Sequence, residues 1–150
     1  MSVWGPGPLQ NDDGADWFAD IRDEPSLKMI RQAIEEISDP QHVGYFEVTE
    51  GAEAVAAARV LAESLGSPGD EQVLDEELEE VAQTLKAELT KEGRRDIAKL
   101  VRQAINVLEI VLNDREKSEL RQMWEEQVEV MPEWIAAMSS LQRRLRMLAV

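Results

Sequence analysis

The sequence predicts an all-α fold, a compact single domain of about six to seven helices. Apolar residues recur every three or four positions through most of the chain, which is the period of an amphipathic helix. Hydrophobic residues make up 43% of the 150 residues, enough for one substantial core. Only the segment 41–49 is rich in the β-branched and aromatic residues that favour strands, and without a partner of similar length it is expected to be an ordered loop.

Residues 1–11 are predicted to be an ordered Gly/Pro-rich arm, and residues 12–150 the helical body. Gly5 and Gly7 would allow a close approach of the backbone, while the neighbouring prolines stiffen it. We expect Trp4 to pack on the body and Trp17 to be buried, both near Trp124 or Trp134. No Gly-Lys-Ser/Thr follows the glycines, which argues against a phosphate-binding turn.

The first two helices are predicted from capping residues and apolar stripes. Asn11 or Asp12 can cap a helix that runs to about Ile21. Pro25 and Ser26 then start a second helix, which Asp39-Pro40 ends. The inward residues of the second helix are predicted to be Leu27, Ile30, Ala33, Ile34 and Ile37.

The middle of the chain predicts three further helices. An alanine-rich helix runs from about Glu50 to Leu65, with one apolar side, and is stopped by residues 66–69. Asp75 is expected to cap the next helix, and Gly93 marks the break that follows it. The helix of residues 97–112 is the longest and most apolar, so it is expected to be the central one; Asn113-Asp114 closes it. The inward residues of the helix after Asp75 are predicted to be Leu78, Val81, Ala82, Leu85 and Leu89.

Two helices are predicted at the end of the chain. Ser118 caps, or lies early within, a helix that carries Leu120, Met123 and Trp124. Pro132 begins the last helix, because proline is tolerated in a first turn. Its inward residues are predicted to be Ile135, Met138, Leu141, Leu145 and Leu148.

The net charge of -15 is unevenly distributed. Residues 1–90 contain 5 basic and 21 acidic residues, whereas residues 91–150 contain 11 basic and 10 acidic residues. The acidic part repels nucleic acid and anionic membranes and attracts basic partners. No apolar run approaches a signal peptide or a membrane span, and there is no cysteine, so a cytoplasmic protein without disulfides is expected.

The N-terminal pattern resembles a bacterial family. Trp4-Gly5-Pro6-Gly7, Asn11-Asp12 and Asp16-Trp17 are similar to the opening motif of the family catalogued as domain of unknown function 4259. The alanine-rich run and the block 118–134 resemble later parts of it. The sequence departs from this pattern at Ser2, Leu9 and Gly14, and a glycine at position 14 is expected to weaken the first helical turn by up to about 1 kcal/mol relative to alanine. The resemblance implies no activity.

The chain offers few candidate catalytic or metal sites. Asp12, Asp16 and Asp20 share one helix face, so they are the weak candidates for binding a divalent cation; a capped helix start with a solvated acidic side is the preferred interpretation. The only histidine, His42, lies in no catalytic motif. We therefore expect no enzyme activity, no cofactor and no metal.

Charged segments offer the candidate binding residues. Seven carboxylates fall within eleven residues and are either a docking surface or the solvated face of a helix: Asp70, Glu71, Asp75, Glu76, Glu77, Glu79 and Glu80. Arg143, Arg144 and Arg146 make the last helix basic at its end, which is expected mainly to balance charge within the molecule.

The hypothesis drawn from the sequence is a protein-binding module whose partner has a basic surface, as in regulatory or immunity-type pairs, with no direct nucleic-acid or membrane binding. A DNA mimic that inhibits a nucleic-acid-binding protein is the main alternative. An enzyme using Asp12, Asp16 or Asp20 with a divalent ion is the next, followed by a purely structural oligomer.

Overall fold

The computed structural model describes residues 5–39, 44–67 and 75–148, with the side chain of Asp75 excepted. Seven helices account for most of these residues, and no strand occurs among them, so the all-α prediction is confirmed. The helices are α1 (Asp12–Asp23), α2 (Leu27–Ser38), α3 (Val48–Ser64), α4 (Asp75–Leu89), α5 (Arg94–Asn113), α6 (Glu119–Glu125) and α7 (Met131–Leu148).

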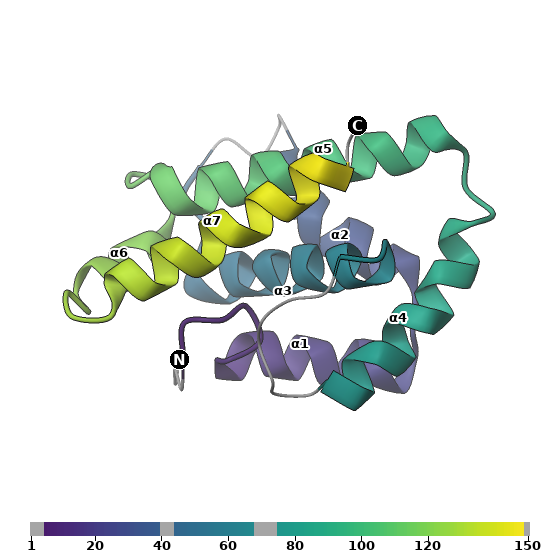
Figure 1. Cartoon of the computed structure of the whole chain (residues 1–150). Helices are drawn as coiled ribbons and strands as arrows, with labels where there is room; N and C mark the ends of the chain where they lie inside the picture. Colours follow the sequence, from purple (N-terminus) through teal and green to yellow (C-terminus); the bar gives the residue numbers. More distant parts are fainter. Residues whose placement is uncertain (1–4, 40–43, 68–74, 149–150) are drawn as a thin grey trace.

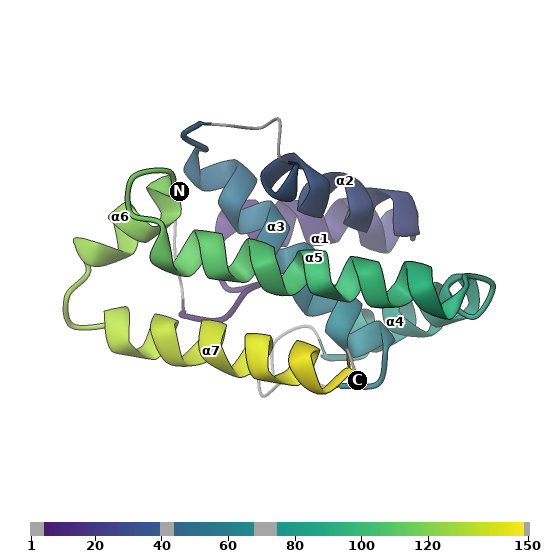
Figure 2. The same ribbon diagram turned by 90° about the horizontal axis from the view of Figure 1, so that it is seen from above.

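The helices form layers around α3 (Figure 1). In that view α5 and α7 form the upper layer, α2 and α3 lie in the middle, and α1 with much of α4 lies below. Figure 2, seen from above, shows α5 and α7 side by side in front of the other helices. Among the described residues, no helix is both long and apolar enough to cross a membrane.

The central helix is α3, not α5 as the sequence predicted. It packs on all six other helices, and its residues from Ala54 to Ala62 are all buried, including Arg59. Arg59 is only 1% exposed and forms an ion pair with Glu63 at 3.2 Å. Alanine side chains are short, so neighbouring helices can approach α3 from every side and no single apolar stripe results. The longest helix is α5, as predicted, but its outer side is exposed.

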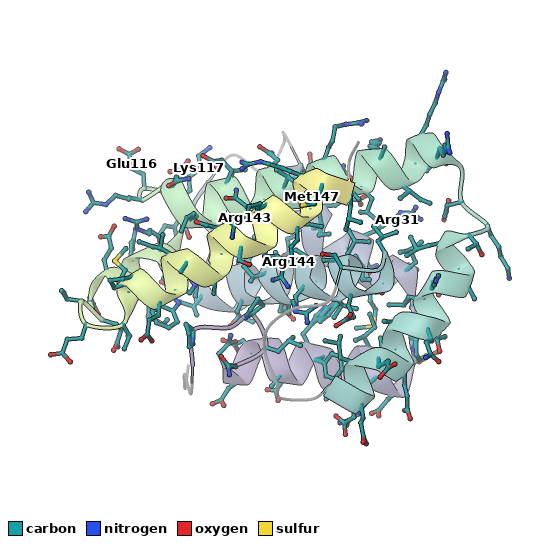
Figure 3. The ribbon with its side chains drawn as sticks, in the orientation of Figure 1. Arg31, Glu116, Lys117, Arg143, Arg144 and Met147 are labelled. Carbon is teal, nitrogen blue, oxygen red and sulfur yellow. The ribbon has the colours of Figure 1, made fainter. Side chains whose placement is uncertain are left out.

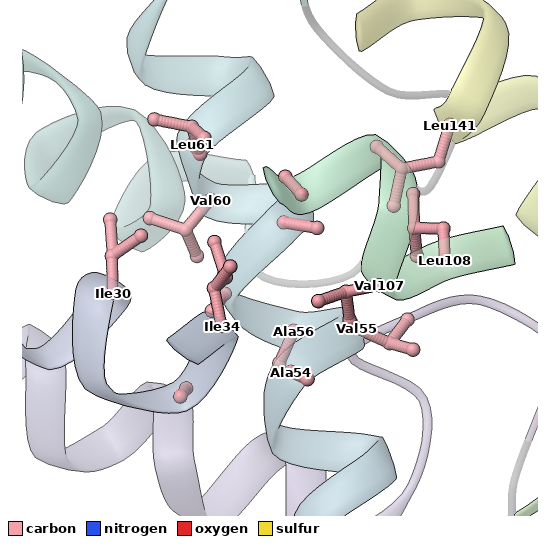
Figure 4. Packing of buried hydrophobic residues seen from close by; sticks show 14 of the residues in the cluster. Ile30, Ile34, Ala54, Val55, Ala56, Val60, Leu61, Val107, Leu108 and Leu141 are labelled. Atoms are coloured by element: carbon pink, nitrogen blue, oxygen red, sulfur yellow. The ribbon is translucent and has the colours of Figure 1, made fainter. Parts of the chain in front are cut away.

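The predicted apolar stripes of α2 and α4 are confirmed, because every residue assigned to them is buried. Ile30 and Ile34 of α2 pack toward α3, and Leu108 of α5 and Leu141 of α7 pack on its other side (Figure 4). In the last helix, Met138, Leu141 and Leu145 are buried, while Ile135 and Leu148 are half-buried. The core therefore extends from the α1–α4 layer to the α5–α7 layer.

Capping residues begin several helices where the sequence predicted. The Asn11 side chain caps α1 by accepting a hydrogen bond from the Gly14 N–H at 2.7 Å. Ser118 caps α6 through the Arg121 N–H at 3.1 Å. Helix α4 is described from Asp75 onward and residues 71–74 lie outside the described residues, so the predicted cap stays a prediction. Helix α3 begins at Val48, two residues earlier than predicted. Such small shifts are typical at helix ends.

Residues 44–47 lead into α3 without a strand. Phe46 forms an isolated parallel bridge with Ser118: its N–H donates to the Lys117 carbonyl at 2.8 Å, and its carbonyl accepts from the Glu119 N–H at 3.2 Å. Residues 41–43, and with them His42, lie outside the described residues. In the described part, the expectation of an ordered loop fits better than a strand.

Hydrogen bonds fold the described part of the arm into a turn just before α1. The Gly5 N–H donates to the Gln10 carbonyl at 3.2 Å, and the Gly7 N–H donates to Gln10 Oε1 at 2.8 Å. A Cβ on Gly5 would lie 2.5 Å from the same Oε1, so a larger residue there would require the Gln10 side chain to move. Both amide groups are used within the arm, which removes them from any phosphate-binding role.

Trp17 is buried, at 6% exposure, as predicted, and Leu9 of the arm is buried at 3%. Trp4 lies outside the described residues, so its predicted packing stays a prediction. Trp124 and Trp134 stack on each other with ring centroids 5.5 Å apart and join α6 to α7.

Candidate functional site

The exposed side of α1 is acidic because its apolar residues point inward. Trp17, Phe18 and Ile21 are buried, whereas Asp12, Asp16 and Asp20 are exposed. These three aspartates follow one another at intervals of four residues, about 6 Å along the helix axis. The side of α1 that faces solvent is therefore a row of carboxylates.

The exposed side of α4 carries a second group of carboxylates. Leu78, Val81 and Leu85 face the core, and Glu76, Glu79 and Glu80 are exposed. Glu77 is half-buried, and its Oε2 accepts a hydrogen bond from Arg22 of α1 at 3.1 Å. This ion pair joins the two helices. Asp70 and Glu71 lie outside the described residues, as does the side chain of Asp75.

We call the exposed carboxylates of these two helices the acidic face: Asp12, Asp16, Asp20, Glu76, Glu79 and Glu80. Carboxylate oxygens, drawn red, project from α1 and α4 along the lower edge of Figure 3. Together α1 and α4 contain eleven acidic residues and two basic ones, a net charge of -9. The structure thus brings together carboxylates that lie more than fifty residues apart in the sequence.

The negative potential extends from α1 onto α2 and α3. The pKa of Glu53 in α3 is raised, first because burial disfavours the charged carboxylate and then because other carboxylates repel it. The strongest repulsion comes from Glu36, followed by Asp13, Glu50 and Asp20. Sequence reasoning missed this cluster, because its members come from three helices and share no spacing.

The candidate metal residues do not form a metal site in the described part of the chain. No group of three or more His, Cys, Asp or Glu residues there could hold an ion. Asp12, Asp16 and Asp20 lie one behind another on an exposed helix face instead of converging. The arrangement is that of a solvated acidic row, in which Asp12 and Asp13 also lie near the positive end of the α1 dipole.

A polar cleft lies where α2 meets the turn between α4 and α5. Arg31 of α2, labelled in Figure 3, forms an ion pair with Glu92 at 3.2 Å in the middle of this cleft. Its cavity volume on one side of the ion pair is about 390 Å³, lined by residues that include Lys28, Glu88 and Lys91. Cations and carboxylates are nearly balanced along the cleft, so it favours neither an anion nor a cation.

Tyr45 and Glu119 form a junction between the start of α3 and α6. The Tyr45 hydroxyl donates to Glu119 Oε2 at 2.6 Å, and Glu119 Oε1 accepts from the Val48 N–H at 3.0 Å. The hydrogen bond to Glu119, with partial desolvation and nearby carboxylates, raises the pKa of Tyr45 to about 12. The same bonds lower the pKa of Glu119. The junction secures a helix start and leaves neither group poised for proton transfer near neutral pH.

The basic end of α7 was predicted to balance charge within the molecule, and Arg146 in the last turn does lie at the negative end of the helix dipole. Arg143 and Arg146 are exposed and form no ion pair with a described residue. Arg144 is half-buried and its Nε donates to the Ser140 carbonyl at 3.4 Å. Two of the three arginines are therefore exposed and, among the described residues, have no carboxylate within ion-pair distance.

Comparison with known proteins gave one match. The family model described as domain of unknown function (DUF4259) matches residues 2–137. No curated protein and no solved structure matches the chain.

Proposed function

Because the chain belongs to the family described as domain of unknown function (DUF4259), and this description names no activity, we propose a function from the charged residues on the surface. We propose that the protein is a non-enzymatic module that binds a protein with a basic surface through the acidic face, as in a regulatory or immunity-type pair. The observation that carries the proposal is the gathering of exposed carboxylates on α1 and α4, two helices joined by the Arg22–Glu77 ion pair.

The charge distribution supports recognition of a basic partner. Clustered like charges raise the local potential and speed the encounter with an oppositely charged surface. Five of the six carboxylates of the acidic face have no ion-pair partner among the described residues: Asp16, Asp20, Glu76, Glu79 and Glu80. A partner's lysines and arginines would therefore form new pairs without breaking existing ones.

Affinity capture with matched charge variants tests the proposal. The acidic-face variant carries Asp16→Asn, Asp20→Asn, Glu76→Gln and Glu79→Gln. The control removes four exposed carboxylates at the α6–α7 end of the molecule: Glu116→Gln, Glu126→Gln, Glu129→Gln and Glu133→Gln. Both have the same net charge. We expect the immobilised wild type and the control to capture the same basic protein from a lysate of the encoding organism, and the acidic-face variant to lose it.

Two results would contradict the proposal. One is that no basic protein binds the wild type at physiological ionic strength. The other is that both variants lose the captured protein equally, because the interaction would then depend on net charge and not on the acidic face.

DNA mimicry is a second candidate for the same face. Its support is that the carboxylates form rows on two adjoining helices, with steps of about 6 Å along α1. The partner would then be a nucleic-acid-binding protein whose DNA site the acidic face occupies. Adding duplex DNA should release such a partner from the immobilised chain; a captured partner that DNA does not displace excludes mimicry but leaves protein binding intact.

A further inference from the structure

Six cations form a second charged surface on α5 and α7. All six are exposed, and none forms an ion pair or hydrogen bond through its side chain with a described residue. Arg22, Arg31 and Arg121, by contrast, each pair with a carboxylate. The chain has 31 acidic and 16 basic residues, yet these six cations form no ion pair with a described residue, although Lys99 lines the polar cleft beside Glu35, Glu92 and Asp96. We call this group the basic face: Arg94, Arg95, Lys99, Arg102, Arg143 and Arg146.

Five of the six cations lie on two neighbouring helix sides: three share one side of α5, and Arg143 and Arg146, three residues apart, share one side of α7. Arg95, Lys99 and Arg102 follow at intervals of four and three residues, so they share one exposed side of α5. Helix α7 runs antiparallel to α5, and Gln142 Nε2 of α7 donates to Glu109 Oε2 of α5 at 3.2 Å. Nitrogen-tipped side chains, drawn blue, project from the N-terminal part of α5 at the upper edge of Figure 3, which also labels Arg143.

The two charged faces lie on opposite sides of the molecule. The α5–α7 layer and the α1 layer are separated by α3, which packs on both (Figure 1). Packed helices lie about 8 to 10 Å apart, so two layers separate the faces by roughly twice that distance. The Debye length at physiological ionic strength is only about 8 Å. The basic face can therefore attract anionic groups even though the whole chain is acidic.

We propose that the basic face docks on the acidic face of a second copy of this chain. The charges are complementary: α5 and α7 carry seven cations and three carboxylates, a net +4, whereas α1 and α4 carry a net -9. The contact joins different surfaces of the two copies, so it leaves one acidic and one basic face open and allows further copies to add. It goes beyond the proposed function, because it needs no other protein.

The proposal implies a weak contact that depends on ionic strength. Exposed ion pairs contribute little individually, so dissociation is expected to be rapid and association visible only at high protein concentration. At about 10 mM salt the Debye length reaches about 30 Å, and repulsion between two chains of charge -15 weakens the contact. At about 1 M salt screening removes the attraction. Association should thus be strongest near physiological ionic strength.

Sedimentation velocity with complementary variants tests the docking. The basic-face variant carries Lys99→Gln, Arg102→Gln and Arg143→Gln, and the acidic-face variant is the one defined above. We expect the wild-type sedimentation coefficient to rise with concentration near physiological salt. Each variant alone should remain monomeric, with its dissociation constant raised by at least about tenfold. An equimolar mixture should form a 1:1 dimer and nothing larger, because one intact face of each kind remains.

The mixture also controls for folding, since misfolded variants could not restore a defined dimer. A wild type that stays monomeric at every concentration and salt overturns the proposal. So does association that persists in 1 M salt, or a basic-face variant that associates like the wild type. If the basic face binds a polyglutamate peptide or duplex DNA and the chain does not self-associate, the proposal is also wrong, because the ligand of the basic face is then not a second copy of the chain. The capture of a basic partner by the acidic face can succeed or fail whether or not the chain associates with itself, so the two proposals are tested separately.

Discussion

Gly14 lies where the N-terminal arm comes closest to α1. A Cβ at this position would be 2.7 Å from the Pro8 carbonyl oxygen and 3.0 Å from Asn11 Oδ1, the atom that caps the helix. Both are closer than carbon atoms normally approach oxygen, so a side chain would displace the arm or the cap. The expectation that glycine weakens this turn relative to alanine considered only helix propensity and missed this contact.

Gly14→Ala should therefore lower the thermal unfolding midpoint, although alanine favours helix by about 1 kcal/mol. The physical reason is the clash with Pro8, which outweighs the gain in propensity. Ala19→Gly, at a half-buried position of the same helix, loses both helix propensity and a partly buried methyl group and should cost at least about 1 kcal/mol. A higher midpoint for Gly14→Ala would show that the arm yields easily and that its contact with α1 is weak.

Glu53 is a carboxylate that the fold disfavours in its charged form. Its pKa is higher in the folded than in the unfolded chain, so the folded state binds the proton more tightly. Stability therefore falls as the pH rises from the pKa of the unfolded chain to that of the folded chain. Glu53→Gln should raise the unfolding midpoint near neutral pH, and the gain should vanish below pH 4.5. Glu129→Gln, which removes an exposed charge, is the control. Equal midpoints for the two variants near neutral pH would contradict the inference that burial and neighbouring carboxylates disfavour the charged form of Glu53.

At the scale of the element, α3 determines how tightly the layers pack. Ala56, Ala57 and Ala58 are fully buried at consecutive positions, so helices press on α3 from several directions. Interiors at this density accept little added volume. The short side chains are thus a structural requirement of the central helix.

Ala57→Leu should destabilise the fold by about 1 to 3 kcal/mol, because the added methyl groups overpack the core. Ala87→Leu, on the exposed side of α4, adds the same volume in solvent and should change stability little. Chemical denaturation of both variants measures the difference. If both changes cost the same, α3 is not the tightly enclosed helix that its burial indicates.

The elements differ in how well the sequence predicted them, for a physical reason. The predicted buried residues of α2 were all correct, because large apolar residues recur with the helical period between polar and charged ones. The central place of α3 was missed, since alanine is compatible with either burial or exposure and gives no direction. Caps such as Asn11 and Ser118 were found because their signal is local.

Contacts between distant segments could not be predicted from spacing. The bond from Tyr45 to Glu119 spans 74 residues and the Arg31–Glu92 contact spans 61, and neither leaves a pattern in the sequence. The acidic run was visible in α4, but its union with the α1 aspartates depends on tertiary packing. The composition likewise showed that positive charge gathers after residue 90, without showing that six exposed cations of α5 and α7 form no ion pair with a described residue.

At the scale of the whole molecule, the chain is a stack of layers with opposite charge on its two outer sides. The acidic face on α1 and α4 and the basic face on α5 and α7 are held apart by the buried α3. Because screening acts over a shorter distance than this separation at physiological salt, each face can bind its own partner. Both proposals above therefore place binding on these two charged surfaces.

The most direct test of this account is to measure how binding to the captured basic partner depends on ionic strength. Titration calorimetry would compare the wild type, the acidic-face variant and the α6–α7 control. The wild type and the α6–α7 control should lose affinity with salt along the same steep slope. The acidic-face variant should bind at least about tenfold more weakly, with a shallower slope. Equal affinities and slopes for the acidic-face variant and the control would contradict the central claim that the carboxylates of α1 and α4 form the binding surface.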